Sequence, residues 1–69
     1  AARELELLFA SVILEGGYTD IDPGELAIGY AALIDGLHLA LLVTPRELTK
    51  QNAKKIGRDF LRRAFPNHI

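Results

Sequence analysis

Residues 26–43 constrain the fold of this chain more than any other part of its sequence. These 18 residues read LAIGYAALIDGLHLALLV, and only Asp35 and His38 among them can carry a charge. A helix over this run is apolar on nearly every side, so it must be covered on nearly every side. A chain of 69 residues is hardly large enough to provide that cover by itself. The run therefore needs either a second copy of the chain or a membrane, and we favour the second copy.

Small residues form a smooth strip along one face of the predicted central helix. Most of them lie three or four positions apart, a spacing that places side chains on one side of a helix. They are Gly29, Ala32, Gly36 and Ala40, and they are flanked by Leu33 and Leu37. Because small side chains let another backbone approach closely, the strip predicts a helix–helix interface.

Two amphipathic segments flank the central run. In residues 3–16 the apolar positions recur at helical spacing; they are Leu5, Leu8, Phe9, Val12 and Ile13. In residues 50–64 the corresponding stripe consists of Ala53, Ile56, Gly57, Phe60, Leu61 and Ala64. No run alternates polar and apolar residues over the length of a strand. The sequence predicts an all-α chain of three helices, at about residues 3–16, 23–43 and 50–64.

Local signals set the ends of these helices. Gly16 and Gly17 can end the first one, because glycine adopts the left-handed conformation at little steric cost. Asp22 followed by Pro23 is typical of a helix start, and Thr49 offers a cap for the third helix after a turn at residues 44–48. We expect residues 67–69, after Pro66, to be a frayed tail.

Composition excludes some classes of site and leaves others open. The chain has no cysteine, so it has no disulfide framework and no thiolate metal site. It also has no methionine, which predicts a processed product or a fragment of a longer protein. Residues 1–43 have a net charge of −6 and residues 44–69 a net charge of +5. Such a split is typical of solvated helix faces of opposite sign.

Three further functions have some support in the sequence: a catalytic or metal site, a nucleic-acid contact and a membrane span. Asp35 and His38 are three positions apart and can meet, but no nucleophile or further metal ligand accompanies them in the helix. The basic third helix could contact nucleic acid, yet Phe60 lies on its apolar side and is needed for packing. The central run reaches the lower length limit of a membrane span, but Asp35 falls near its middle. We therefore expect no enzyme, no metal or other cofactor and no membrane insertion.

The central run also resembles a known family. From Tyr30 onward, YAALIDGLHLAL resembles the penultimate helix of the TetR family of bacterial transcription repressors, in the branch typified by the choline-responsive repressor BetI, whose pattern there is similar to AALIDGLWLR. His38 stands where that pattern has Trp, and Ala40 where it has Arg. The resemblance continues into the last helix of the family and spans about residues 26–66; the matching positions there are Leu48, Lys50, Ala53, Arg58, Phe60 and Pro66.

The resemblance implies a function. Family members have an N-terminal helix-turn-helix that binds operator DNA, and a C-terminal helical domain that binds a small effector and forms a homodimer. Their last two helices pack against the same helices of the partner as a four-helix bundle. No helix-turn-helix lies in these 69 residues, so we expect residues 1–69 to be the C-terminal dimerisation segment of a larger cytoplasmic repressor, which contacts operator DNA only through a missing N-terminal domain.

Two sets of site residues follow. The predicted dimer interface, which we call the bundle face, consists of Gly29, Ala32, Leu33, Gly36, Leu37, Ala40, Ile56, Gly57, Phe60 and Ala64. A ligand cavity for a small-molecule effector would be bordered by Tyr30, Asp35 and His38. The alternative function is a stand-alone small helical homodimeric interaction module or ligand-binding protein.

Overall fold

The chain folds into three α-helices. The computed structural model describes residues 2–68, with their side chains from residue 3 onward. Helix α1 spans Ala2–Gly16, α2 spans Pro23–Val43 and α3 spans Lys50–Ala64. No strand occurs within residues 2–68. The prediction of an all-α chain with three helices is confirmed, and the bounds of α2 and α3 agree with the predicted ones.

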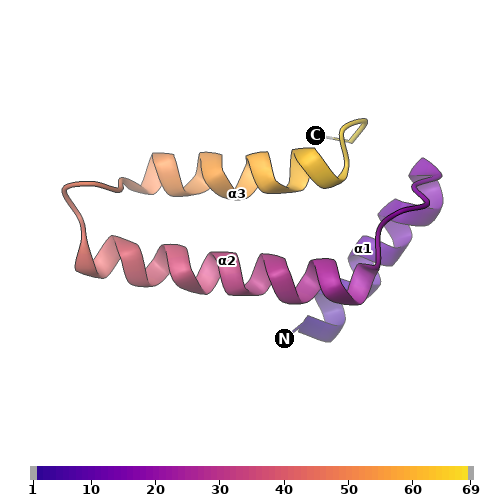
Figure 1. Cartoon of the computed structure of the whole chain (residues 1–69), viewed down its shortest axis with the longest axis horizontal. Coiled ribbons are helices and arrows are strands. Elements are labelled where there is room, and N and C mark those ends of the chain that lie inside the picture. The colour runs from indigo at the N-terminus through magenta and orange to yellow at the C-terminus, as the bar shows by residue number, and fades with distance from the viewer. Residues whose placement is uncertain (1, 69) are drawn as a thin grey trace.

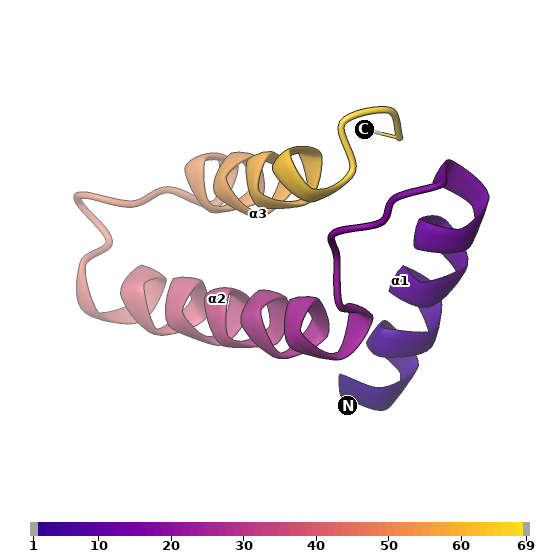
Figure 2. The ribbon, with the colours of Figure 1, turned by 45° about the vertical axis from the view of Figure 1, so that its right-hand side comes forward.

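Helices α2 and α3 form an antiparallel hairpin, and α1 crosses it at one end. Figure 1 shows α3 running back along α2, with the connection between them at the end of the molecule farthest from α1. Figure 2, turned by 45°, shows α1 across the N-terminal end of α2. The molecule is elongated, with extents of 40 × 23 × 15 Å. Because α1 reaches only one end of the hairpin, the other end has no third helix beside it.

Capping residues fix the ends of the helices at the expected positions. The backbone of Gly17 has a φ of 68°, and the N–H of Tyr18 donates to the carbonyl of Ile13 at 3.1 Å, a pattern that closes α1. The carboxylate of Asp22 accepts the N–H groups of Gly24 and Glu25 at 2.8 and 3.1 Å. The Thr49 hydroxyl accepts the N–H of Asn52 at 3.1 Å and so caps α3.

A turn joins α2 to α3, as expected for residues 44–48. The N–H of Thr44 donates to the carbonyl of Ala40 at 2.7 Å, which ends α2. The carbonyl of Thr44 then accepts the N–H groups of Glu47 and Leu48 at 3.0 and 3.1 Å. These bonds hold residues 44–48 as a turn and not as a helix. The Thr49 cap of α3 follows directly.

The hydrophobic core lies where α1, α2 and the end of α3 meet. Phe9, Ala27 and Phe65 are buried together, with exposed fractions of 3%, 1% and 2%. The ring centroids of Phe9 and Phe65 are 5.6 Å apart, and the Tyr18 ring lies 5.4 Å from that of Phe65. Leu5, Val12 and Ile13 of the predicted α1 stripe pack around this cluster. One ring from each of three segments therefore closes this end of the molecule.

One sequence-based expectation about the side chains of α1 differs from the structure. Leu8 was placed on the buried stripe of α1, but 59% of it is exposed. It lies 100° around the helix from Phe9, which points into the core, so Leu8 points away from the core. The buried stripe of α1 is therefore narrower than its run of leucines suggests.

The expectation of a frayed tail is wrong for Asn67 and His68. The N–H of Asn67 donates to the Tyr18 hydroxyl at 3.1 Å, and this hydroxyl lies 3.0 Å from Nδ1 of His68. Nε2 of His68 is 3.8 Å from a carboxylate oxygen of Glu15. Burial of Phe65 brings the following residues against the α1–α2 connection, where Tyr18 holds them. Residue 69 lies outside the described residues.

Candidate dimerisation surface and ligand pocket

Helix α2 is scarcely covered within one chain. Ala27 is its only buried residue. Four large apolar side chains of α2 are strongly exposed; they are Ile28 (65%), Leu39 (62%), Leu42 (81%) and Val43 (68%). Apolar patches of this kind on a folded protein are typical of interaction surfaces. The structure thus leaves large apolar side chains of the most apolar helix exposed to solvent.

The small-residue strip of α2 lies partly in the seam with α3 and partly in the open. A Cβ atom added at Gly29 would lie 3.8 Å from Cζ of Phe60, whereas one added at Gly36 would meet nothing within 4 Å. Ala32 is exposed, and Ala40 is half-buried. Gly36 therefore marks an open position of the strip, seven residues along α2 from Gly29.

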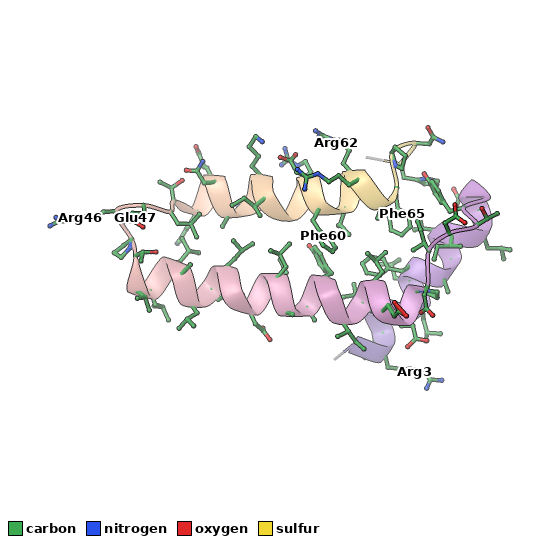
Figure 3. All side chains as sticks on the ribbon, in the orientation of Figure 1. Arg3, Arg46, Glu47, Phe60, Arg62 and Phe65 are labelled. Carbon is green, nitrogen blue, oxygen red and sulfur yellow. The ribbon has the colours of Figure 1, made fainter. Side chains whose placement is uncertain are left out.

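On α3, the predicted interface residues divide between the seam and its rim. Gly57 is buried, and a Cβ atom there would meet Cδ1 of Ile34 at 3.6 Å and the Tyr30 hydroxyl at 3.9 Å. Gly57 therefore lets α3 lie close to α2 within one chain. Ile56, by contrast, is 42% exposed. Figure 3 shows the Phe60 side chain between α2 and α3.

The two halves of the bundle face approach each other at Gly29 and Phe60. The contact between Gly29 and Phe60 joins one edge of α2 to one edge of α3. Because the helices are antiparallel, one turn forward from Gly29 on α2 corresponds to one turn back from Phe60 on α3, so helix geometry predicts that Leu33 and Ile56 lie at the same level. The open Gly36 follows Leu33 along the same edge. We therefore expect the edge of α2 that carries the strip and the edge of α3 that carries Ile56 to form one apolar surface.

The three residues expected at a ligand cavity have different environments. The ring of Tyr30 packs in the interior, with its centroid 6.0 Å from those of both Phe9 and Phe60. Asp35 is exposed, and among the described residues no hydrogen bond or ion pair joins it to His38. His38 lines a pocket between α2 and α3. The structure therefore does not gather the three side chains around one cavity.

The pocket beside His38 has a volume of about 290 Å³ and lies between the second half of α2 and the first turns of α3. Its wall is mainly aliphatic, and its rim carries two lysines. The lining residues are Ile34, Leu37, His38, Leu41, Lys50, Ala53 and Lys54. In the sequence analysis, the positive charge of residues 44–69 is interpreted as a solvated helix face, and these two lysines are not singled out as a site. Lys50 and Lys54 are four positions apart at the start of a predicted helix, and this spacing places both side chains on one face. It is the sequence signal that indicates a shared site.

Charged groups on the outer face of α3 pair with one another. Nζ of Lys55 lies 2.6 Å from a carboxylate oxygen of Asp59, and the Arg62 guanidinium lies 3.5 Å from the other oxygen. The hydrogen bond from Lys55 is the largest cause that holds the pKa of Asp59 below its ordinary value; nearby positive charges add to the effect, and burial opposes it. Figure 3 shows Arg62 on the side of α3 away from α2. This face is thus a solvated network of ions.

Two further possibilities are a metal site and a membrane-spanning helix. Among the described residues, no group of three or more His, Cys, Asp or Glu side chains could hold a metal ion. Helix α2 is long and apolar enough to cross a membrane by length and composition alone. That property is weak support for a membrane span, because a core helix of a soluble protein passes the same test.

Comparison with known proteins identifies the family. The family model for the C-terminal domain of BetI-type transcriptional repressors, a TetR-type domain, matches residues 1–66. The match extends the resemblance seen from residue 26 onward to the first helix as well. Neither the curated proteins nor the solved structures contain a significant match. With nearly all of its length matched, the chain belongs to the family of BetI-type transcriptional repressor C-terminal domains.

Proposed function

We propose that this chain is the dimerisation segment, and part of the effector-binding domain, of a TetR-like transcriptional repressor. Domains of this family belong to transcription regulators and are not normally enzymes. In the proposed assembly, α2 and α3 pack against the same helices of a second copy as a four-helix bundle. The repressor would act in the cytoplasm and contact operator DNA through another domain, because no helix-turn-helix lies in residues 1–69.

The observation that carries this proposal is the open apolar strip on the bundle face. A Cβ atom added at Gly36 would meet nothing within 4 Å, and Ile56 on α3 is 42% exposed. In a symmetric dimer the same patch meets itself across the two-fold axis, so one open strip can cover another. Gly57, Phe60 and Ala64 would contribute by setting how closely α3 lies against α2 in each copy.

The sharpest test of the interface is Gly36→Leu. The larger side chain should block close approach and weaken the dimer by ~1–3 kcal/mol, as overpacking does in cores. The same change should favour the α2 helix itself by ~1 kcal/mol, because leucine is a better helix former than glycine. A dimer that weakens while helicity is kept or increased therefore indicates a steric effect at the interface and not a loss of folding.

Sedimentation equilibrium over a wide concentration range measures the dimer constant, and circular dichroism on the same samples measures helicity. Gln51→Leu is the matched control, because Gln51 is exposed on α3 and does not belong to the bundle face. We expect the control to dimerise like the unmodified chain. An unchanged dimer constant in Gly36→Leu, or a chain that is monomeric at all concentrations, would refute the proposed interface.

A further inference from the structure

The charged rim of the pocket between α2 and α3 lies away from the bundle face, although the pocket wall shares Leu37 with that face. His38 lies two positions after Gly36, and Lys54 two positions before Ile56. Two positions correspond to 200° around a helix, so His38 points away from Gly36, and Lys54 points away from Ile56. A second copy that covers the bundle face, Leu37 included, would therefore leave the rim of the pocket at His38 and Lys54 accessible. The pocket is available for a ligand in the proposed dimer.

The mouth of the pocket is positively charged. Lys50 and Lys54 both line it, and neither forms an ion pair with another described residue. Both lie at the start of α3, whose first turn contains no acidic residue. A helix start carries a partial positive charge from its unpaired N–H groups, and acidic side chains usually balance it. At this helix start two lysines add to the positive charge, and no carboxylate of the helix balances it.

The interior of the pocket is apolar. Ile34, Leu37 and Leu41 form its wall on α2, and the small side chain of Ala53 leaves the space between the helices unfilled. A volume of about 290 Å³ is near the lower end of the range for small-molecule sites, which are mostly apolar with a few polar groups that orient the ligand. The pocket thus combines a short apolar chamber with a cationic rim.

We propose that this pocket binds a small molecule with a short apolar body and a single carboxylate. The carboxylate lies between the ammonium groups of Lys50 and Lys54 at the start of α3, and His38 borders it from α2. The apolar body extends along Ile34, Leu37 and Leu41. The inference rests on the proposed function in that it names the effector class of the regulator, but the pocket itself is formed within one chain.

The test is a titration followed by two-dimensional ¹H–¹⁵N NMR with three probes of equal chain length. Octanoate carries the carboxylate, octan-1-ol is uncharged and octylammonium carries the opposite charge. We expect octanoate to shift the amide signals of Leu41, Ala53 and Lys54 in a saturable way, and to bind at least ten times more tightly than the other two probes. Added salt should weaken octanoate binding, because the pairing is exposed at the rim.

Two variants separate charge from space. Lys54→Gln should weaken octanoate binding several-fold, whereas Lys55→Gln should not, because Lys55 pairs with Asp59 on the outer face of α3. Ala53→Leu keeps both lysines but fills the chamber, so it should abolish the shifts at Leu41. Equal binding of octanoate and octylammonium, equal effects of the two lysine variants, or shifts confined to the bundle face would each overturn the proposal.

Sedimentation equilibrium on the same samples separates this inference from the proposed function. A dimer that does not bind octanoate would overturn the ligand assignment and leave the dimerisation role intact. A monomer that binds octanoate with the expected preference would overturn the dimer and leave the pocket intact. Octanoate bound equally well by Ala53→Leu would show general adsorption to the exposed apolar surface and would refute the site.

Discussion

Near the start of α2, rings from three segments fill the interior, whereas near its end α2 faces α3 across small side chains and a pocket. Phe9, Ala27 and Phe65 are almost fully buried at the first end. At the other end, Leu42 and Val43 are 81% and 68% exposed. Figure 1 shows the reason in outline, since α1 lies at one end of the hairpin only.

The comparison shows what large and small side chains do in a chain of this length. Each aromatic ring buries a large area and closes its end of the molecule without help from another chain. Glycine and alanine cover little surface themselves, but they permit a close approach by something else. The closed end therefore provides the stability of the single chain, and the open end carries its proposed interactions.

Phe9→Ala should break the closed end and have the largest effect. Removal of a buried phenylalanine typically lowers the free energy of unfolding by ~3–5 kcal/mol, and Phe9 contacts the rings of both Tyr30 and Phe65. Urea unfolding at one fixed protein concentration measures the loss, because a dimer would make stability depend on concentration. Leu14→Ala is the control, since Leu14 is 85% exposed. Equal losses in the two variants would refute the assigned core.

Asp22→Ala should cost ~1 kcal/mol of stability, because it removes the N-cap of α2 at the closed end. Asp22 accepts two backbone N–H groups, whereas Thr49 accepts one at the start of α3. We therefore expect a smaller loss for Thr49→Ala, measured by the same urea unfolding. A larger loss at Thr49 would mean that α3 depends on its cap more than α2 does and would reverse the comparison.

Tyr18→Phe should release the tail without disturbing the ring cluster. The hydroxyl of Tyr18 binds the N–H of Asn67 and approaches Nδ1 of His68, whereas its ring packs against Phe65. Loss of the hydroxyl should lower stability by ~0.5–1.5 kcal/mol. Amide hydrogen exchange should become faster at Asn67 and stay unchanged at Phe65. Unchanged exchange at Asn67 would contradict the role of this hydroxyl.

The pH dependence of the ion network on α3 should be the smallest effect. Because the folded chain lowers the pKa of Asp59, chiefly through the hydrogen bond from Lys55, the ionised carboxylate favours the folded state. This contribution is present above the ordinary aspartate pKa and is lost as the pH falls through the lowered one. Thermal unfolding of the chain and of Asp59→Asn should therefore converge in acid. A difference that grows in acid would have the wrong sign.

The sequence predicted the helices well because their ends depend on local chemistry. Pro23 after Asp22 and the Thr49 cap act within a few residues, so no knowledge of the rest of the chain is needed to place them. The unusual burial requirement of α2 was equally visible, because it follows from the composition of the helix alone. The lack of cover over α2 in one chain agrees with that requirement.

Side-chain partners were harder to predict because they depend on how the helices are rotated and aligned. All three glycines Gly29, Gly36 and Gly57 belong to the predicted bundle face. A Cβ atom at Gly29 would meet Phe60 and one at Gly57 would meet Ile34 of the same chain, whereas one at Gly36 would meet nothing within 4 Å. Tyr18 gave no local sign that it would hold Asn67, which lies 49 positions later. The pocket rim of Lys50 and Lys54 likewise exists only because α3 packs against Leu37 and Leu41.

The contact between Tyr18 and His68 joins residues 50 positions apart and so closes the chain into a ring. Closing so long a loop costs more entropy than pairing neighbouring helices, so this contact should form late in folding. Contacts that form after the transition state slow unfolding and leave the folding rate nearly unchanged. The Tyr18 hydroxyl should therefore lower the unfolding rate, and so lengthen the lifetime of the folded chain, with little effect on the folding rate.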